Sequence, residues 1–210
     1  MVAIIKIASL EFSRKVFFEG FLSSSFSEIK KNNIENLIID IRNNPGGSTL
    51  LAKECFNYIT NRSYAVSKEE IFLKDGKLKK DPDETLTAPQ PVANKFKGNV
   101  VLLTNSLTGS SAHMMAASFN YYKFGKIVGD ISPITKSIFG EVSQFTLPKS
   151  ELIVYCPTSF FILPYFSNPD KRITPDYFYR ETLQDKLSDN DTQLQYCLKI
   201  IKNRTEIGNK

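Results

Sequence analysis

The sequence predicts an α/β domain in which helices cover both faces of a mostly parallel β-sheet. Three observations support this prediction: short apolar runs, amphipathic segments that alternate with them, and turn residues at the junctions. The apolar runs are Val2–Ala8, Asn36–Arg42, Asn99–Thr104 and Lys126–Gly129. Continuous apolar runs of this length are typical of strands that are buried on both faces of a parallel sheet.

Helical segments separate and follow these runs. Apolar residues recur every three or four positions along Lys15–Lys31, which indicates an amphipathic helix. Leu50–Thr60 is a second helical segment, and Ser48 before it is suited to cap its N-terminus. Ser110–Tyr122 is rich in Ala and Met, and Asp189–Lys202 closes the pattern as a last helix.

Two regions do not follow this alternation. Residues 62–97 are mixed, with an expected strand at Tyr64–Val66 and an expected hairpin turn at Lys74–Lys77. After Gly129 the pattern changes to strands joined by turns, at Glu141–Leu147 and Leu152–Tyr155. We therefore expect a β-rich part towards the C-terminus.

The composition excludes several classes of protein. The chain has 210 residues, a formal charge of +5 and 41% apolar residues, which is enough to build a core and argues against intrinsic disorder. Every apolar run is too short to span a bilayer as a helix. Three widely spaced cysteines and one histidine favour neither a disulfide scaffold nor a metal site. The Lys and Arg residues are scattered among acids, so no nucleic-acid surface is predicted.

Glycines follow the second apolar run. The strand-loop of residues 36–48 ends in Gly46 and Gly47, which can adopt positive φ and expose backbone N–H groups. Strand ends of this kind are where α/β sheets present ligands. A tight turn that needs glycine only for its shape is the simpler interpretation, and no Lys-Ser/Thr pair follows to make a phosphate-binding loop.

Serines follow the third run. Ser110 and Ser111 stand at the start of a helix, where free N–H groups and the helix dipole stabilise negative charge. A serine in this position can serve as a nucleophile, although serine is also a preferred N-terminal cap. Taken alone, the segment therefore favours capping over catalysis.

Together the two segments resemble the C-terminal processing peptidase family, which includes the tricorn core protease. Five motifs of the family occur here in the same order. The strand-loop motif is matched by Asp40–Gly47, the serine helix by Ser110–His113, and the strand that follows it by Ile127–Asp130. Two later signatures are matched by Leu147–Ser150 and Ile173–Asp176. The likeness extends over residues 3 to 202. It departs from the pattern where a histidine replaces the usual Glu of the serine helix, and where two glycine-rich stretches lack their glycines.

The resemblance implies a crotonase/ClpP-like core and serine-type peptide hydrolysis through an acyl-enzyme, without a cofactor. It implies that Ser110 is the nucleophile. The oxyanion donors would be the N–H of Ser111 and an N–H of Gly46 or Gly47. Asp40 and the arginine two residues later are expected to support the loop.

The general base is less well defined by the sequence. The processing branch of the family uses a lysine about 25 residues after the serine, which points to Lys136, one position out of register. The tricorn branch implies a carboxylate near the last signature, which Asp170 could supply, and an upstream histidine that this chain lacks. His113 lies one helical turn from the nucleophile and is a weaker candidate.

We therefore expect a single catalytic core over residues 1–210, the C-terminal domain of a longer chain. It would cut peptides or the C-terminal ends of unfolded proteins, as a tail-specific protease does. The alternative is a catalytically degenerate member that binds peptides or acts as a scaffold. An acyl-CoA enzyme of the crotonase type would not explain the serine. We expect no membrane span, while oligomerisation is open. No leader is visible, so the protein is cytoplasmic or the sequence begins inside a longer chain. The family implies an extracytoplasmic location if a leader precedes it.

Overall fold

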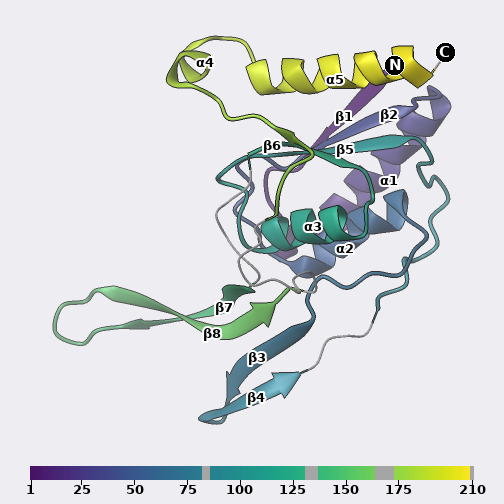
Figure 1. Ribbon diagram of the computed structural model, residues 1–210. Coiled ribbons are helices and arrows are strands. Elements are labelled where there is room, and N and C mark those ends of the chain that lie inside the picture. The colour runs from purple at the N-terminus through teal and green to yellow at the C-terminus, as the bar shows by residue number, and fades with distance from the viewer. Residues whose placement is uncertain (82–85, 131–136, 164–172, 209–210) are drawn as a thin grey trace.

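The computed structural model describes residues 1–81, 86–130, 137–163 and 173–208, and its centre is a parallel β-sheet (Figure 1). The strand order is β1-β2-β5-β6-β9, and every neighbouring pair is parallel. The strands are β1 (Val2–Lys6), β2 (Asn36–Asp40), β5 (Asn99–Thr104), β6 (Lys126–Gly129) and β9 (Tyr177–Phe178). The α/β class and the parallel sheet predicted from the apolar runs are therefore confirmed.

Helices cover both faces of this sheet, as Figure 1 shows. Three helices pack on one face, and a single helix, α5, lies across the other. The three helices are α1 (Lys15–Lys31), α2 (Thr49–Ile59) and α3 (Ser110–Tyr121), and α5 is Thr192–Gly208. A short 3₁₀ turn, η1 (Phe12–Arg14), precedes α1, and a short helix, α4 (Leu183–Leu187), precedes α5.

Alternation along the strands explains why both faces are apolar. In β2, Leu37 and Ile39 join the core beneath the three helices, whereas Ile38 faces Cys197 and Ile201 of α5. All five residues of β2 are buried, because successive side chains point to opposite faces and each face has its own cover. A run without polar alternation is the expected signature of such a strand.

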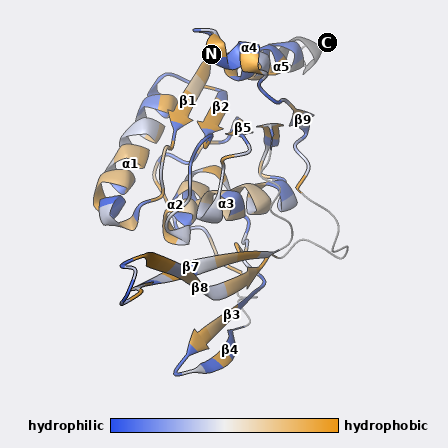
Figure 2. Ribbon diagram, turned by 90° about the vertical axis from the view of Figure 1, so that its left-hand side faces the viewer, coloured by the Kyte–Doolittle hydropathy of each residue, from blue (hydrophilic) through white to orange (hydrophobic). Residues whose placement is uncertain are grey.

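A second, antiparallel sheet lies below α2 and α3 (Figures 1 and 2). Its order is β4-β3-β8-β7. The strands are β3 (Glu69–Lys74), β4 (Lys77–Asp81), β7 (Ser137–Thr146) and β8 (Ile153–Ile162). The predicted hairpin and the β-rich part after β6 are confirmed, and the sheet joins them because β3 pairs with β8.

The strand predicted at Tyr64–Val66 is wrong. Only an isolated bridge from Tyr64 to Thr87 forms there. The apolar character that suggested a strand has another cause. The Tyr64 ring is fully buried, with its ring edge-on to Phe56 and to Phe124. Tertiary packing therefore explains these residues without a ladder of backbone hydrogen bonds.

Candidate active site

Ser110 begins α3 at the carboxyl edge of the parallel sheet. The chain leaves β5, makes a short loop and enters α3 with Gly109 as the N-cap. Ser110 has φ +46°, a left-handed conformation that costs a residue with a side chain about 1–2 kcal/mol. Strain of this kind persists only where the surroundings hold it, and it is common at functional sites.

Gly46 and Gly47 lie against the start of α3. A Cβ atom built on Gly46 would lie 2.5 Å from Ser110 Cβ and 2.8 Å from the Ser111 nitrogen. Only glycine fits there, because the neighbouring atoms already occupy the space of a side chain. Both glycines have positive φ, +104° and +136°, as predicted for this loop. The two segments singled out in the sequence are therefore in contact.

The hydrogen bonds of the loop decide which glycine N–H is free. The Gly46 N–H donates to Asn44 Oδ1 at 2.8 Å, so it is occupied. The Gly46 carbonyl accepts the Leu10 N–H at 2.9 Å. The Gly46 carbonyl and the Gly47 N–H belong to the same planar trans peptide and therefore point in opposite directions. Because the carbonyl faces Leu10, the Gly47 N–H points away from Leu10. In the described part of the chain this N–H has no acceptor, and neither has the N–H of Ser111.

Asn44 holds the glycine loop in place, and the sequence reasoning did not single it out. It is fully buried, and its side chain donates to the Ile7 carbonyl at 2.9 Å while it accepts from Gly46. Asn44 thus ties the glycine loop to the end of β1. Its place inside the matched strand-loop motif was the available signal, but the motif alone does not show which hydrogen bonds it makes.

Ser110 and Gly47 line one cleft of about 480 Å³ between α2, α3 and the antiparallel sheet. Apolar side chains and charged side chains both contribute to its lining. The apolar ones include Val66, Met114, Ile138 and Phe161, and the charged ones are Lys53, Glu70 and Glu141. The Glu70 carboxylate is fixed by a 2.7 Å hydrogen bond from Ser159.

His113 does not line this cleft. Its side chain is fully buried, and within the described ranges neither ring nitrogen has a hydrogen-bond partner. Burial lowers its pKa from 6.5 to about 4, so the imidazole is neutral at pH 7. No hydrogen bond joins it to Ser110 among the residues that the structure describes. The other candidate bases, Lys136 and Asp170, lie outside the described residues.

The low pKa of His113 makes stability depend on pH. The unfolded chain binds a proton near pH 6.5 that the folded chain takes up only near pH 4, so stability falls as pH falls through this window. Between pH 7.5 and 5.0 we expect a loss of about 2 kcal/mol from this group. His113→Met should remove that dependence in urea unfolding curves. Because the chain has one histidine, equal slopes in both proteins over this range would contradict the assignment.

Asp40 and Arg42 support the end of β2, as expected from the sequence. Arg42 donates to Asp40 through Nε at 3.0 Å and Nη2 at 2.8 Å, and it also binds Asp191 before α5. Through these bonds Arg42 joins the loop after β2 to α5, the helix on the other face of the parallel sheet. Neither Asp40 nor Arg42 lines the cleft that contains Ser110.

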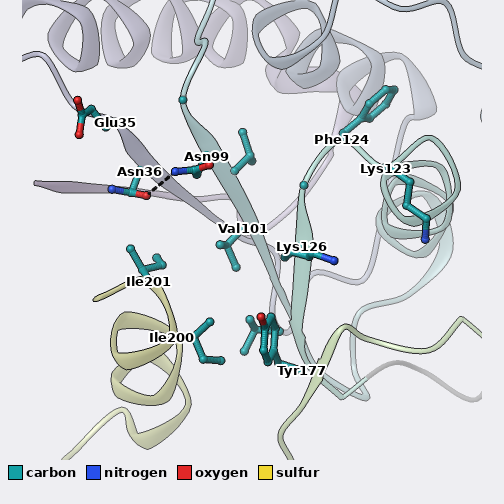
Figure 3. A pocket seen from close by; sticks show the side chains of 14 residues that line it. Glu35, Asn36, Asn99, Val101, Lys123, Phe124, Lys126, Tyr177, Ile200 and Ile201 are labelled. Atoms are coloured by element: carbon teal, nitrogen blue, oxygen red, sulfur yellow. Dashed lines mark hydrogen bonds between the residues drawn. The ribbon is translucent and has the colours of Figure 1, made fainter. Parts of the chain in front are cut away.

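A second cavity lies at the opposite, amino-terminal edge of the sheet (Figure 3). Its volume is about 600 Å³, larger than that of the cleft. Ile200 and Ile201 of α5 point into it, Asn36 and Asn99 are hydrogen-bonded to each other at 3.1 Å, and Lys126 is paired with Asp176. Its lining as described contains no serine, cysteine or histidine, and neither Ser110 nor the glycine loop reaches it.

Comparisons with known proteins identify the family of this chain. The sequence profile of Peptidase family S41 matches residues 1–178. The chain belongs to this family. The recognition of a processing-peptidase relative from the motifs is therefore confirmed, and the family is one of serine peptidases.

Relatives of this S41 chain are distant. A probable CtpA-like serine protease from Staphylococcus epidermidis is 24% identical over 188 residues, which cover 87% of this chain and 37% of the relative. The photosystem II D1 C-terminal processing protease has a TM-score of 0.57 at 17% identity, covering 84% of this chain and 42% of that one. Mature CPAF has a TM-score of 0.64 at 17% identity, with coverages of 88% and 47%. The chain thus spans less than half the length of each of these three proteins.

The S41 core offers no metal centre in the part that the structure describes, where no group of three or more His, Cys, Asp or Glu side chains could hold an ion. Across the same described ranges, no helix combines the length and the apolar character that crossing a membrane requires.

Substitution of Gly47 should be severe in this S41 chain. A Cβ atom at Gly47 would overlap the Leu10 carbonyl, and positive φ adds backbone strain. We expect Gly47→Ala to lower the free energy of unfolding by at least about 2 kcal/mol and to abolish activity. Gly76→Ala is the matched control, because Gly76 also has positive φ but nothing lies within 4 Å of its added Cβ. Equal losses in the two variants would show that the Leu10–Gly47 contact is unimportant.

Proposed function

We propose that this S41 chain hydrolyses peptide bonds through an acyl-enzyme on Ser110, acting on peptides or on the C-terminal ends of proteins. One observation carries the proposal. Ser110 begins a helix beside Gly46, in a cleft shared with Gly47, while the N–H groups of Ser111 and Gly47 have no acceptor among the described residues. A crotonase/ClpP-like arrangement of the core fits the same geometry.

The chemistry follows from these groups. Ser110 Oγ attacks the carbonyl carbon of the scissile bond, and its proton passes to a base. The carbonyl oxygen becomes an oxyanion that accepts from the N–H groups of Ser111 and Gly47. The base then protonates the leaving amine, and water hydrolyses the acyl-enzyme by the same steps in reverse order. No cofactor is needed for this sequence.

Lys136 is our proposed base, with Asp170 as an orienting carboxylate and His113 as the weaker alternative. A lysine can accept the proton if burial or neighbouring cations lower its pKa towards neutrality. His113 is less suited, because its pKa of about 4 makes it a weak base at pH 7 and it does not line the cleft.

The substrate proposed is a peptide or an unfolded protein segment. The cleft combines apolar side chains with charges of both signs, as a site for mixed side chains requires. The names of the distant relatives, a CtpA-like serine protease and a D1 C-terminal processing protease, support cleavage near protein C-terminal ends.

Hydrolysis of casein and of short fluorogenic peptides, with products identified by mass spectrometry, tests this function. We expect cleavage that a serine-directed phosphonate blocks and that rises with pH as the Lys136 amine deprotonates. Lys136→Ala should reduce the rate as much as loss of the nucleophile does, whereas His113→Ala should not. Cleavage that survives both substitutions would show that the base is misplaced.

The alternative is a degenerate family member that binds peptides in the same cleft without cutting them. One observation favours it: among the described residues, no side chain hydrogen-bonds Ser110 Oγ, and His113, the candidate base that lies among them, does not line the cleft. Such a protein should bind peptides in the cleft but should not react with the phosphonate.

A further inference from the structure

The hydroxyl of Ser111 makes a contact that the proposed mechanism does not use. Ser111 contributes its N–H to oxyanion binding, yet its side chain is also engaged. Ser111 Oγ donates to the Gly47 carbonyl at 2.7 Å, and the residue is only 5% exposed. Since Ser111 belongs to α3 and Gly47 to the loop after β2, this bond joins the two segments that together form the site.

The first part of the glycine loop is tied to the segment before α3, where the Gly109 N–H donates to the Asn44 carbonyl at 2.9 Å, whereas the two peptide units around Gly47 are held by Leu10. Leu10 donates its N–H to the Gly46 carbonyl at 2.9 Å and accepts the Ser48 N–H at 2.7 Å. These two bonds anchor the peptide units on either side of Gly47 to the segment after β1. The Gly47 carbonyl and the Ser48 N–H belong to one trans peptide and point in opposite directions. Because the Ser48 N–H faces Leu10, the Gly47 carbonyl faces α3. There Ser111 supplies the donor.

We propose that the Ser111 hydroxyl is a positioning group, which fixes the Gly47 carbonyl and thereby holds the Gly47 N–H at the distance from Ser110 that oxyanion binding requires. The inference rests on the proposed function, because it assigns a role within that site. Glycine rotates about its backbone bonds more freely than any other residue type. A hydrogen bond that holds the Gly47 carbonyl, in addition to the bonds from Leu10, therefore restricts the backbone most at this position. An oxyanion donor acts only when it is held in place before the reaction.

The position of the serine supports a specific role over a general packing role. A buried hydroxyl in a helix normally bonds back to the carbonyl four residues earlier. Ser118 of the same helix does so, donating to Met114 at 2.9 Å, and it also contacts the Ala65 carbonyl at 3.2 Å. Ser111 stands in the first turn of α3, where no helical carbonyl lies four residues earlier, and its hydroxyl reaches the glycine loop. Ser118 therefore provides a matched control, because it is buried in α3 but does not line the cleft.

The test compares the wild-type chain with Ser111→Ala, Ser111→Thr and Ser118→Ala. The reaction rate and the binding constant of a serine-directed phosphonate are measured separately, beside peptide kcat and KM. We expect Ser111→Ala to lower the phosphonate reaction rate and kcat about tenfold with KM unchanged. Ser111→Thr, which keeps a hydroxyl, should restore most of the rate, and Ser118→Ala should react as the wild type does.

Two results would overturn the proposal. One is a wild-type rate in Ser111→Ala. The other is an equal loss in Ser118→Ala, which would show a general effect on the helix. If the wild-type chain does not react at all, the proposed function fails separately. In that case, amide hydrogen exchange at Ser48, whose N–H is bonded to the Leu10 carbonyl, tests the anchor independently of activity. Faster exchange in Ser111→Ala than in Ser118→Ala supports the anchor, and unchanged exchange contradicts it.

Discussion

Ser110→Ala should abolish peptide hydrolysis, with kcat reduced by at least about 10³-fold, while the melting temperature changes little. The reason is that the hydroxyl supplies the bond to the acyl group, and no other group can replace it. Stability should be nearly unaffected, because the alanine keeps the same Cβ contact with Gly46 and the same left-handed backbone. Steady-state kinetics and thermal unfolding measure the two effects.

Ser110→Gly provides the control for backbone strain. Glycine tolerates φ +46° without the penalty of a side chain, so this variant should be inactive but more stable than Ser110→Ala by about 1 kcal/mol. Residual hydrolysis at the wild-type rate in either variant would exclude Ser110 as the nucleophile. A large loss of stability in the alanine variant would instead indicate that the serine has a structural role.

Arg42→Ala should cause the largest loss of stability, about 3 kcal/mol or more. Asp40 is 3% exposed, and its carboxylate faces the Arg42 guanidinium at 2.8 Å. Removal of the arginine side chain leaves the buried Asp40 charge without its counter-ion, although the backbone N–H of residue 42 still donates to it at 3.0 Å, and loss of the counter-ion costs far more than the net value of the pair. Urea unfolding of the variant at pH 7 measures this loss.

Asp191→Asn separates the contribution of the exposed Arg42–Asp191 ion pair from that of the buried Arg42–Asp40 pair. The Asp191 side chain is 41% exposed, and an asparagine can still accept the Leu194 N–H at the start of α5. We expect a loss of about 1 kcal/mol or less, as for other exposed ion pairs. If Arg42→Ala costs no more than Asp191→Asn, the pair with Asp40 does not support the strand end.

The sequence was most informative where local patterns match the tertiary environment. β5 and β6 have the predicted bounds, and α1 runs from Lys15 to Lys31 as expected from its apolar spacing. Ser48 caps α2 by accepting from the Leu50 N–H. These elements bury the faces that their periodicity indicates, so propensity, capping and packing agree.

The site was predictable to the level of which segments meet, but not of which atoms are free. Glycines after one strand and serines after the next identify the two segments. The assignment of Gly47 over Gly46 as donor required the hydrogen bond from Gly46 to Asn44, which depends on a side-chain orientation. Likewise, nothing in the sequence indicates that the hydroxyl of Ser111, which follows Ser110, reaches the Gly47 carbonyl.

For His113, the sequence pattern suggested a contact with Ser110 that the structure does not contain. Helical spacing places His113 one turn from Ser110, which favours a shared face. In the structure the residue is fully buried and does not line the cleft, because α3 packs between two sheets and both of its sides are covered. Periodicity describes which residues share a face, but it does not identify the face that borders the substrate.

Reaction with a serine-directed fluorophosphonate, followed by intact-protein and peptide mass spectrometry, tests the central claim most directly. It needs no knowledge of the substrate, and it reports both the nucleophile and the oxyanion groups beside it. The account predicts one adduct per chain, located on Ser110, and none in Ser110→Ala. Absence of an adduct, or an adduct on another serine that persists in Ser110→Ala, would contradict it.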